Sequence, residues 1–466
     1  MTNNSKKYRK KEHKISSVQP TNEKLTGRAG LAFFVAYLHT IQIFPLLDKM
    51  FGSIRKSKKG VEITELFKQM FCFLMDGTSR HLVYFDHLKK DSGYAGSIET
   101  DQDEMASSHM IKRFFKGFSF VRIYIFRRLL QDLFIWRLRI TQPSVVELGI
   151  DTMVMDNDDA EHRHGVAPTY KKKKGFQPLQ MNWGRYFVDA VFRGGDKHSN
   201  HGDTVQKMIR HMVKKIRKSY REDVPIIIRL DSGFFDQKIF TICEALGVGY
   251  ICGGKFYEDI KEVARTATIW QRFVSQKKKD MWEYIEFGSK RESWKRFRRA
   301  LYCRLMNAGN QLYLPGLRPD TVIITNIGLG DRIDNLLHEA GAEHYLTSQS
   351  LVACYHERGS DELVNRAFKN FGHEQLPFER FLPNSAWYYT MLVGHFLFES
   401  FKEDVGSPVI SINSYADTVR RQFIDIAGKV VSHSGKIIIK IAAACFERLH
   451  LDEILDRCRK APVLQC

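Results

Sequence analysis

The sequence lacks any apolar run near the roughly 18 consecutive residues that a membrane-spanning helix needs. Residues 1–11 are polar and basic, without the apolar stretch that a secretory signal requires. None of the eight cysteines forms a Cys-x-x-Cys pair, and most lie in apolar runs. These absences argue against a membrane protein, a secreted disulfide scaffold and a standard zinc module. We expect a soluble, intracellular protein with reduced thiols.

Acidic residues are scarce relative to basic ones. The chain has 53 Asp and Glu against 72 Lys and Arg, a formal net charge of +19 over 466 residues. Such an excess indicates a polyanionic partner, most often nucleic acid and less often an anionic membrane surface. The charge is spread along the chain, whereas a membrane-surface protein more often concentrates it on one amphipathic helix. We therefore expect nucleic acid as the partner and no membrane.

Apolar patterns divide the first third of the chain into two parts. Residues 1–25 are predicted to be a disordered basic tail, because lysines and arginines there have few apolar neighbours. Residues 26–140 are predicted to be an all-α domain, with helices at 29–47 and 61–75. A short helix that begins at Ser107 and has a basic face suits either DNA recognition or ordinary packing.

The pattern then changes to alternating strands and helices over residues 141–256, which is typical of an α/β core. Residues 257–345 mix aromatic and basic residues and predict a β-rich insertion. Residues 346–400 predict a helical second part of the core, and 401–466 a basic C-terminal region with a helix at 436–449.

Two acidic residues occupy strand positions where a carboxylate is costly to bury without a partner. Asp151 lies inside the apolar segment 145–155, and Asp231 ends the apolar strand 226–230. Ligand sites in open α/β sheets commonly lie near strand ends. Each has a plain alternative, since Asp151 would also suit an exposed edge strand and Asp231 would also suit a helix cap.

Asp156 competes with Asp151 for the same role. The two are five residues apart, so in a strand they point to opposite faces and only one points inward. We choose Asp151 because apolar residues flank it, whereas Asp156 precedes Asn157 in turn-like sequence.

A third acid belongs to a spaced motif, Tyr-x2-Arg-x3-Glu-x6-Lys, formed by Tyr355, Arg358, Glu362 and Lys369. On a helix the first three share one face, and the lysine follows two turns later. The carboxylate suits a metal ion, and the two cations suit backbone phosphates. The plain alternative is an amphipathic helix in which Glu362 pairs with Arg358 or Arg366.

This spacing resembles the YREK signature of a large group of bacterial insertion-sequence transposases, which are DDE enzymes with an RNase H-like core. Residues 229–235 are similar to the block around the second aspartate of that group, and the long gap before the glutamate resembles its β-strand insertion. Many members place the first aspartate in an Asp-Gly-Thr-like turn, and this chain instead has Asp151-Thr152.

The resemblance implies an α/β RNase H-like catalytic core with a β-rich insertion, after an all-α N-terminal DNA-binding domain. It implies cut-and-paste transposition, in which Asp151, Asp231 and Glu362 hold Mg²⁺, with Mn²⁺ as a substitute. Tyr355, Arg358 and Lys369 would hold the transposon end. The implied partners are double-stranded DNA, as terminal inverted repeats and target, and a second copy of the chain in a synaptic complex. The implied location is the bacterial cytoplasm, associated with the nucleoid.

Further basic segments are candidates for DNA contacts. One is the run Lys171, Lys172, Lys173 and Lys174, which would equally suit a solvated loop. Another is the segment around Trp294, Arg296 and Arg298, which would equally suit a solvated face over a packed tryptophan. Trp282 and Trp294 are candidates to stack on a flipped base, although most tryptophans in such a segment are core residues.

Two other functions fit the sequence less well. An RNase H-like nuclease that only cuts DNA would not need the end-holding helix face. A catalytically silent, transposase-derived DNA-binding protein would not need all three carboxylates.

Overall fold

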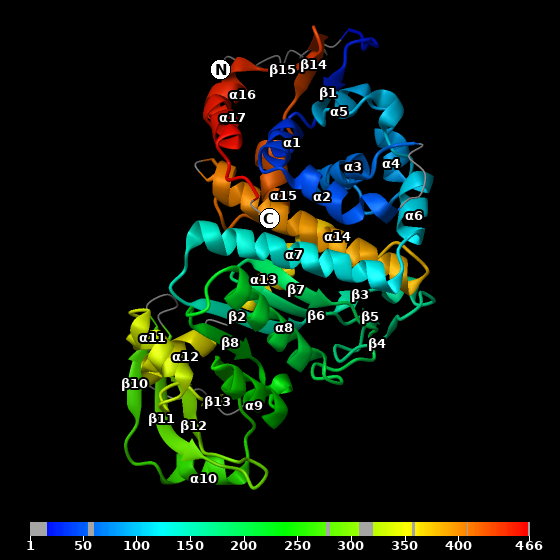
Figure 1. Cartoon of the computed structure of the whole chain (residues 1–466). Helices are drawn as coiled ribbons and strands as arrows, with labels where there is room; N and C mark the ends of the chain where they lie inside the picture. The colour runs from blue at the N-terminus through cyan, green and yellow to red at the C-terminus, as the bar shows by residue number, and fades with distance from the viewer. Residues whose placement is uncertain are drawn as a thin grey trace, which may run out of the picture.

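A mixed sheet of nine strands is the largest element among the described residues (Figure 1). The structure is a computed structural model that describes residues 16–54, 60–275, 280–306, 320–356, 359–407 and 409–464. The strand order is β10-β11-β12-β13-β9-β8-β2-β6-β7. In that order the strands are Gln271–Val274, Met281–Ser289, Arg298–Met306, Thr321–Thr325, Gly249–Gly253, Ile226–Leu230, Val146–Thr152, Leu179–Trp183 and Tyr186–Val191.

The centre of this sheet is parallel and buried on both faces. Strand β8 pairs in parallel with β2 on one side and with β9 on the other. All five of its residues are buried, as its continuous apolar sequence predicts. Helix α8 (Thr204–Ser219) leads into β8, and helix α9 (Gln237–Leu246) connects β8 to β9.

The strands of segment 257–345 extend the same sheet. After helix α10 (Glu258–Thr266), strands β10 to β13 run antiparallel, and β13 pairs with β9. Helices α11 (Arg332–Glu339) and η5 (Glu343–Leu346) follow. The segment is therefore rich in strands, and it continues the central sheet.

Helices cover the other end of the molecule. From the N-terminal side these are α1 (Leu31–Thr40), α2 (Ile43–Phe51), η1 (Gly52–Ile54), α3 (Ile63–Asp76), α4 (Tyr84–Leu88), α5 (Ser92–Ser97), η2 (Gln102–Glu104), α6 (Ser108–Lys116) and α7 (Phe120–Thr141). The C-terminal elements are α14 (Phe381–Phe401), η6 (Lys402–Gly406), α15 (Ala416–Val419), η7 (Arg420–Ile424), β14 (Gly428–His433), β15 (Lys436–Ile441), α16 (Ala443–Arg448) and α17 (Leu451–Arg459).

The N-terminal helices and the C-terminal segment pack together. The short strand β1 (Leu25–Thr26) pairs with β14, and α1 packs against α17. Helix α14, buried from Pro383 to Phe401, packs on α3 and α7, and α7 in turn covers β7 (Figure 1). The hydrophobic core therefore crosses the predicted boundaries at residues 140 and 400, and the predicted division into domains stays a prediction.

The helix predicted at 436–449 is wrong in its first half. Residues Lys436–Ile441 form strand β15, which pairs with β14 in a hairpin, and the helix α16 starts only at Ala443. The run Ile437–Ile439 is β-branched and favours a strand. Ser434 and Gly435 both have positive φ, 50° and 74°, as the tight turn of a hairpin requires.

The helix predicted at 29–47 is likewise divided. Gln42 adopts a left-handed conformation with φ 61°, which ends α1 and begins α2. By length and apolar content, none of the described helices could cross a bilayer alone. Residues Leu31–Thr40 and Ile43–Ile54 would qualify as a pair, and that pair is bent by 70°.

Arg420 joins three parts of the molecule. Its guanidinium donates to the backbone oxygens of Leu74 and Met75 at the end of α3, at 2.8 and 3.0 Å. It also donates to the backbone oxygen of Phe371, at 2.8 Å, near the end of the helix α13 (Gly359–Gly372). These carbonyls have no partner within their own helices, so one side chain caps two helices at once.

We predict that Arg420→Leu destabilises the fold by about 3 kcal/mol, because it leaves several buried carbonyls without a donor. Urea unfolding measures the effect. Arg421→Leu is the matched control, since Arg421 is exposed and its replacement should cost less than about 0.5 kcal/mol. Equal stability of the two variants would contradict the capping role of Arg420.

Candidate functional site

Two aspartates are adjacent because their strands are parallel neighbours. In the β2–β8 pair, Ile150 lies opposite Leu230, so Asp151 and Asp231 are the next residues on the two strands. Parallel strands end at the same edge of a sheet. Both side chains are partly buried there.

Backbone groups orient both carboxylates. The Oδ1 atom of Asp151 accepts from the Thr152 amide at 2.8 Å. The Oδ1 atom of Asp231 accepts from the Gly233 amide at 2.7 Å and caps the short helix η4 (Ser232–Phe234). The capping role considered for Asp231 is therefore real. It occupies one carboxylate oxygen, and a carboxylate has a second that can serve a ligand.

The motif helix lies over this strand edge. The first part of the segment predicted to be helical, 346–400, forms two helices, α12 (Ser348–His356) and α13 (Gly359–Gly372), and Arg358 falls between them, outside the described residues. The Asn365 amide of α13 donates to Asp151 Oδ2 at 3.4 Å. Glu362 is exposed one turn before Asn365, and Lys369 lies one turn after it, so the three share one face.

Tyr170 is a residue on which all three acids act electrostatically. It lies between the short strands β4 (Ala167–Pro168) and β5 (Lys174–Phe176), which with β3 (Met155–Asp156) form a small second sheet. Burial raises the pKa of Tyr170 most, followed by the negative charges of Asp151, Asp231 and Glu362. All three carboxylates therefore act electrostatically on the same phenol. Sequence reasoning missed both Tyr170 and Asn365, although Asn365 occupies the same helix face as Glu362.

The three acids are the kind of donor that a hard divalent cation takes, since Mg²⁺ prefers carboxylate oxygens. Among the described residues, no three Asp, Glu, His or Cys side chains form a closed set of ligands. The three acids have the donor chemistry for such an ion, although they are not grouped as a complete metal site in the part of the chain that the structure describes.

Tyr355 lies against the turn that follows Asp231. The space around Gly253, at the end of β9, shows where Tyr355 lies. A Cβ atom added there would lie 2.6 Å from the Tyr355 hydroxyl and 2.8 Å from the Ser232 amide nitrogen. The hydroxyl therefore fills space that any larger residue at position 253 would take.

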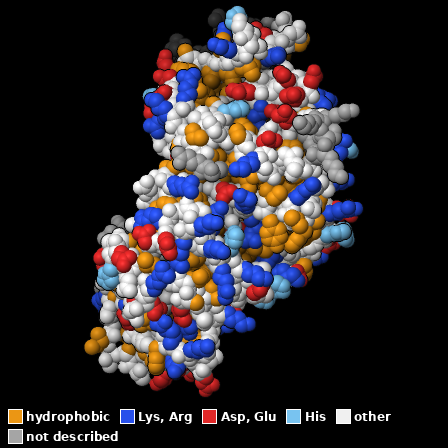
Figure 2. Space-filling model, in the orientation of Figure 1, with side chains coloured by type: hydrophobic (Ala, Val, Ile, Leu, Met, Phe, Trp, Pro, Cys, Tyr) orange, Lys and Arg blue, Asp and Glu red, His pale blue; other side chains and the backbone are white. Residues whose placement is uncertain are grey.

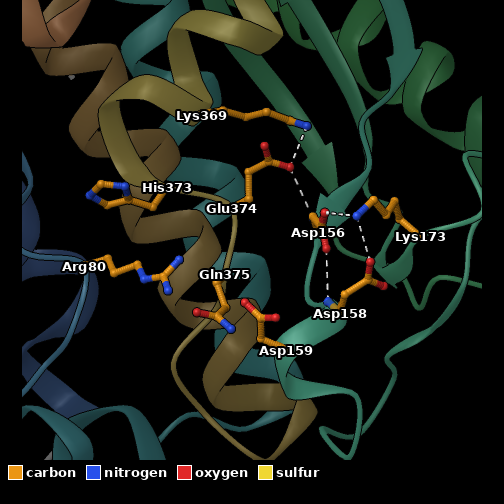
Figure 3. A pocket seen from close by; sticks show the side chains of 9 residues that line it. All are labelled: Arg80, Asp156, Asp158, Asp159, Lys173, Lys369, His373, Glu374 and Gln375. Carbon is orange, nitrogen blue, oxygen red and sulfur yellow. Dashed lines mark hydrogen bonds and ion pairs between the residues drawn. The ribbon is translucent and has the colours of Figure 1, made fainter.

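Lys369 lines a cavity of about 410 Å³, together with Asp156 and Glu374 (Figure 3). Its ammonium group pairs with Glu374 at 2.7 Å, and the same Glu374 oxygen accepts from the Asp156 amide at 3.3 Å. The Asp156 carboxylate pairs with Lys173 at 3.3 Å. The structure thus places Asp156 in this cavity and Asp151 beside Asp231.

The lysine run divides into paired and exposed side chains. Lys173 pairs with Asp158 at 2.9 Å, and Lys174 pairs with Glu161. Lys171 and Lys172 are exposed, and the Lys171 ammonium lies 5.7 Å from the Tyr170 ring centroid. Two members of the run are therefore held in the loop, and two face solvent next to the acids.

The aromatic and basic candidates of segment 257–345 contact other side chains of the protein in this structure. Trp294 is 5% exposed, and the Arg298 guanidinium lies 4.6 Å from its ring centroid and pairs with Glu244 at 2.9 Å. Arg296 pairs with Asp331 at 2.8 Å. Trp282 stacks on His356 with ring centroids 3.5 Å apart. A flipped base would have to displace these contacts.

Comparison with known proteins gives three findings. No curated protein matches the chain. Among solved structures, the chain is similar to a piggyBac transposase in its synaptic complex with hairpin DNA, with 11% identity and a TM-score of 0.36 over 87% of this chain and 83% of that one. The family model described as transposase DDE domain, group 1, matches residues 9–463. Because the match spans nearly the whole chain, the protein belongs to this family of DDE transposases.

Proposed function

We propose that this DDE transposase moves an insertion sequence by metal-dependent cutting and joining of DNA at terminal inverted repeats. The observation that carries the proposal is the way in which the fold places Asp151, Asp231 and Glu362. Two of these acids stand on neighbouring parallel strands and the third on a helix over them. Rigid elements of this kind can hold carboxylates at a fixed separation.

The chemistry assigned to the three acids is ligation of Mg²⁺, with Mn²⁺ as a substitute. Two such ions would activate the attacking hydroxyl and stabilise the leaving oxygen. The chain itself orients the acids, through the Thr152 and Gly233 amides and through Asn365. The proposed RNase H-like core comprises the antiparallel strands β2, β6 and β7 with the parallel strands β8 and β9.

The motif helices are proposed to hold the transposon end, as in the YREK group of bacterial insertion sequences. Tyr355 lies beside the Asp231 turn, where it could contact the DNA next to the scissile phosphate. Lys369 would exchange its bond to Glu374 for a bond to a phosphate. Arg358 is assigned to the same task by its place in the motif. We further propose that a homodimer assembles the synaptic complex in the bacterial cytoplasm.

We predict that Asp231→Asn and Glu362→Gln each lower Mg²⁺-dependent cleavage of DNA carrying the element's ends by at least about 100-fold. Even an outer-shell partner of a metal ligand is worth up to about that much. Both variants should still bind the DNA, because the substitutions remove only acidic charge.

The matched control for this cleavage assay is Asp223→Asn, in the loop before β8. Asp223 is exposed and pairs with Arg221 at 3.1 Å, so its loss should leave cleavage unchanged. Wild-type cleavage by Asp231→Asn and Glu362→Gln would refute the assignment. Cutting without joining by the wild-type protein would favour the nuclease alternative. No cutting with intact binding would favour the silent DNA-binding alternative.

A second prediction concerns the space at Gly253. Gly253→Ala should displace the Tyr355 hydroxyl or the Asp231–Ser232 turn, since the added Cβ would clash with both. A displacement of about 1 Å near reacting groups can cost up to roughly 100-fold in rate. The measurement is the rate of strand cleavage at saturating DNA. Gly27→Ala is the control, because no atom lies within 4 Å of a Cβ added there. Equal rates for the two variants would show that the Tyr355 contact is dispensable.

A further inference from the structure

A second cavity, of about 260 Å³, adjoins the cavity that contains Lys369. The two share the side chains of Arg80 and Gln375. Four basic or ionisable nitrogen side chains line the second cavity: Arg80, His81, Lys112 and Arg163. None of the described residues that line it is acidic. We call these four residues the basic groove.

The basic groove is formed where two parts of the chain meet. Arg80 and His81 come from the loop between α3 and α4, and Lys112 comes from α6. Arg163 comes from the loop that follows the short helix η3 (Asp158–Ala160), on the side of the small sheet. The groove therefore spans the seam between the N-terminal helices and the strands that carry Tyr170.

The two arginines of the groove lack the carboxylate partners that other arginines in this structure have. Not every buried arginine has a carboxylate partner, since Arg193 donates to backbone oxygens, but Arg127 pairs with Asp189 at 2.6 Å and Arg298 with Glu244 at 2.9 Å. Arg163 instead donates to the neutral Asn157 side chain at 3.2 Å. Arg80 lies next to His81, at 3.5 Å. Within the described parts of the chain, neither guanidinium forms a salt bridge.

The charges in the groove also act on one another. The pKa of Arg163 is lowered first by burial and then by the positive charge of Arg80. In the adjoining cavity, the pKa of His373 is lowered by burial first and then by the charges of Arg420 and Arg80. Like charges held close together create a positive potential that an anion would neutralise.

A line of cations runs from Lys369 through Arg80 into the groove, past the carboxylates of Asp156, Asp158, Asp159 and Glu374 in the first cavity. Lys369 shares a helix face with Asn365, which contacts Asp151. Figure 3 shows Lys369 and Arg80 on the rim of one cavity, with Asp156 and Asp158 across from Arg80. From Arg80 the line passes to Arg163 and Lys112 in the second cavity.

We propose that the basic groove binds the sugar-phosphate backbone of the DNA that leads away from the cleaved end. This inference rests on the proposed function, since it takes the three acids as the cutting site. Guanidinium groups match phosphate oxygens in a two-point contact, and such contacts position DNA without reading its sequence. Lys112 belongs to helix α6, which was considered above as a recognition helix. In the proposed complex, this helix contacts the phosphate backbone of the DNA.

The test uses the full-length protein and a fluorescent DNA duplex of arbitrary sequence, without a divalent metal ion. Binding is measured over a series of KCl concentrations for the wild type, Arg80→Gln, Arg163→Gln and the double variant. Loss of one phosphate contact should lower the slope of log affinity against log salt by about 1. Each single variant should also weaken binding about tenfold at low salt, as expected for one charge-assisted contact.

The matched control is Arg457→Gln on α17, which removes the same charge from an arginine paired with Glu453 at 3.0 Å. It should retain the wild-type slope. If Arg163→Gln unfolds because Asn157 loses its partner, Arg80→Gln carries the test, since Arg80 is exposed and makes no ion pair among the described residues. Circular dichroism checks the fold of each variant.

Wild-type salt slopes for Arg80→Gln and the double variant would overturn the proposal. Because the assay needs neither cleavage nor the element's ends, that result would leave the transposase assignment standing if the wild type still cuts. Conversely, reduced slopes in a protein that never cuts would retain the groove and remove the catalytic assignment.

Discussion

The parallel pairing of β2 and β8 is the constraint on which the site depends. It places Asp151 and Asp231 at one edge of the sheet, and the pairing is fixed by the apolar, fully buried sequence of β8. A shift of one residue would turn every side chain of β8 to the opposite face of the sheet and would take Asp231 out of its place next to Asp151. The same register that buries isoleucines therefore also brings two carboxylates together, where amides of Thr152 and Gly233 orient them.

The position of the third acid depends on contacts far from the sheet. Helix α13 is held near its middle by Asn365 on Asp151 and near its C-terminal end by Arg420 on the backbone of Phe371. Arg420 also binds the end of α3, so the N-terminal helices and the C-terminal segment together set where Glu362 lies. The positive charge is not confined to one part of the molecule. Figure 2 shows Lys and Arg side chains spread over both halves of one face.

Much of the central sheet could be predicted from the sequence, because buried parallel strands and amphipathic helices such as α8 have strong patterns. The hairpin of β14 and β15 was missed because the short run Ile437–Ile439 is ambiguous by periodicity alone, although its β-branched residues and the Ser434–Gly435 turn favour strands. Tyr170 could not be found either, because it reaches the acids through loop geometry that no local pattern encodes. Basic residues were ambiguous for a similar reason: Arg298 and Arg80 look alike in sequence, and only packing reveals that one is paired with Glu244 and the other is not.

The most direct test of the central claim is a crystal structure of the protein with Mn²⁺ and DNA, with the metal located by its anomalous scattering. The account predicts metal density among Asp151, Asp231 and Glu362. Metal density instead in the cavity of Asp156, Asp158 and Asp159 would contradict it and would move the catalytic centre to the other side of Lys369.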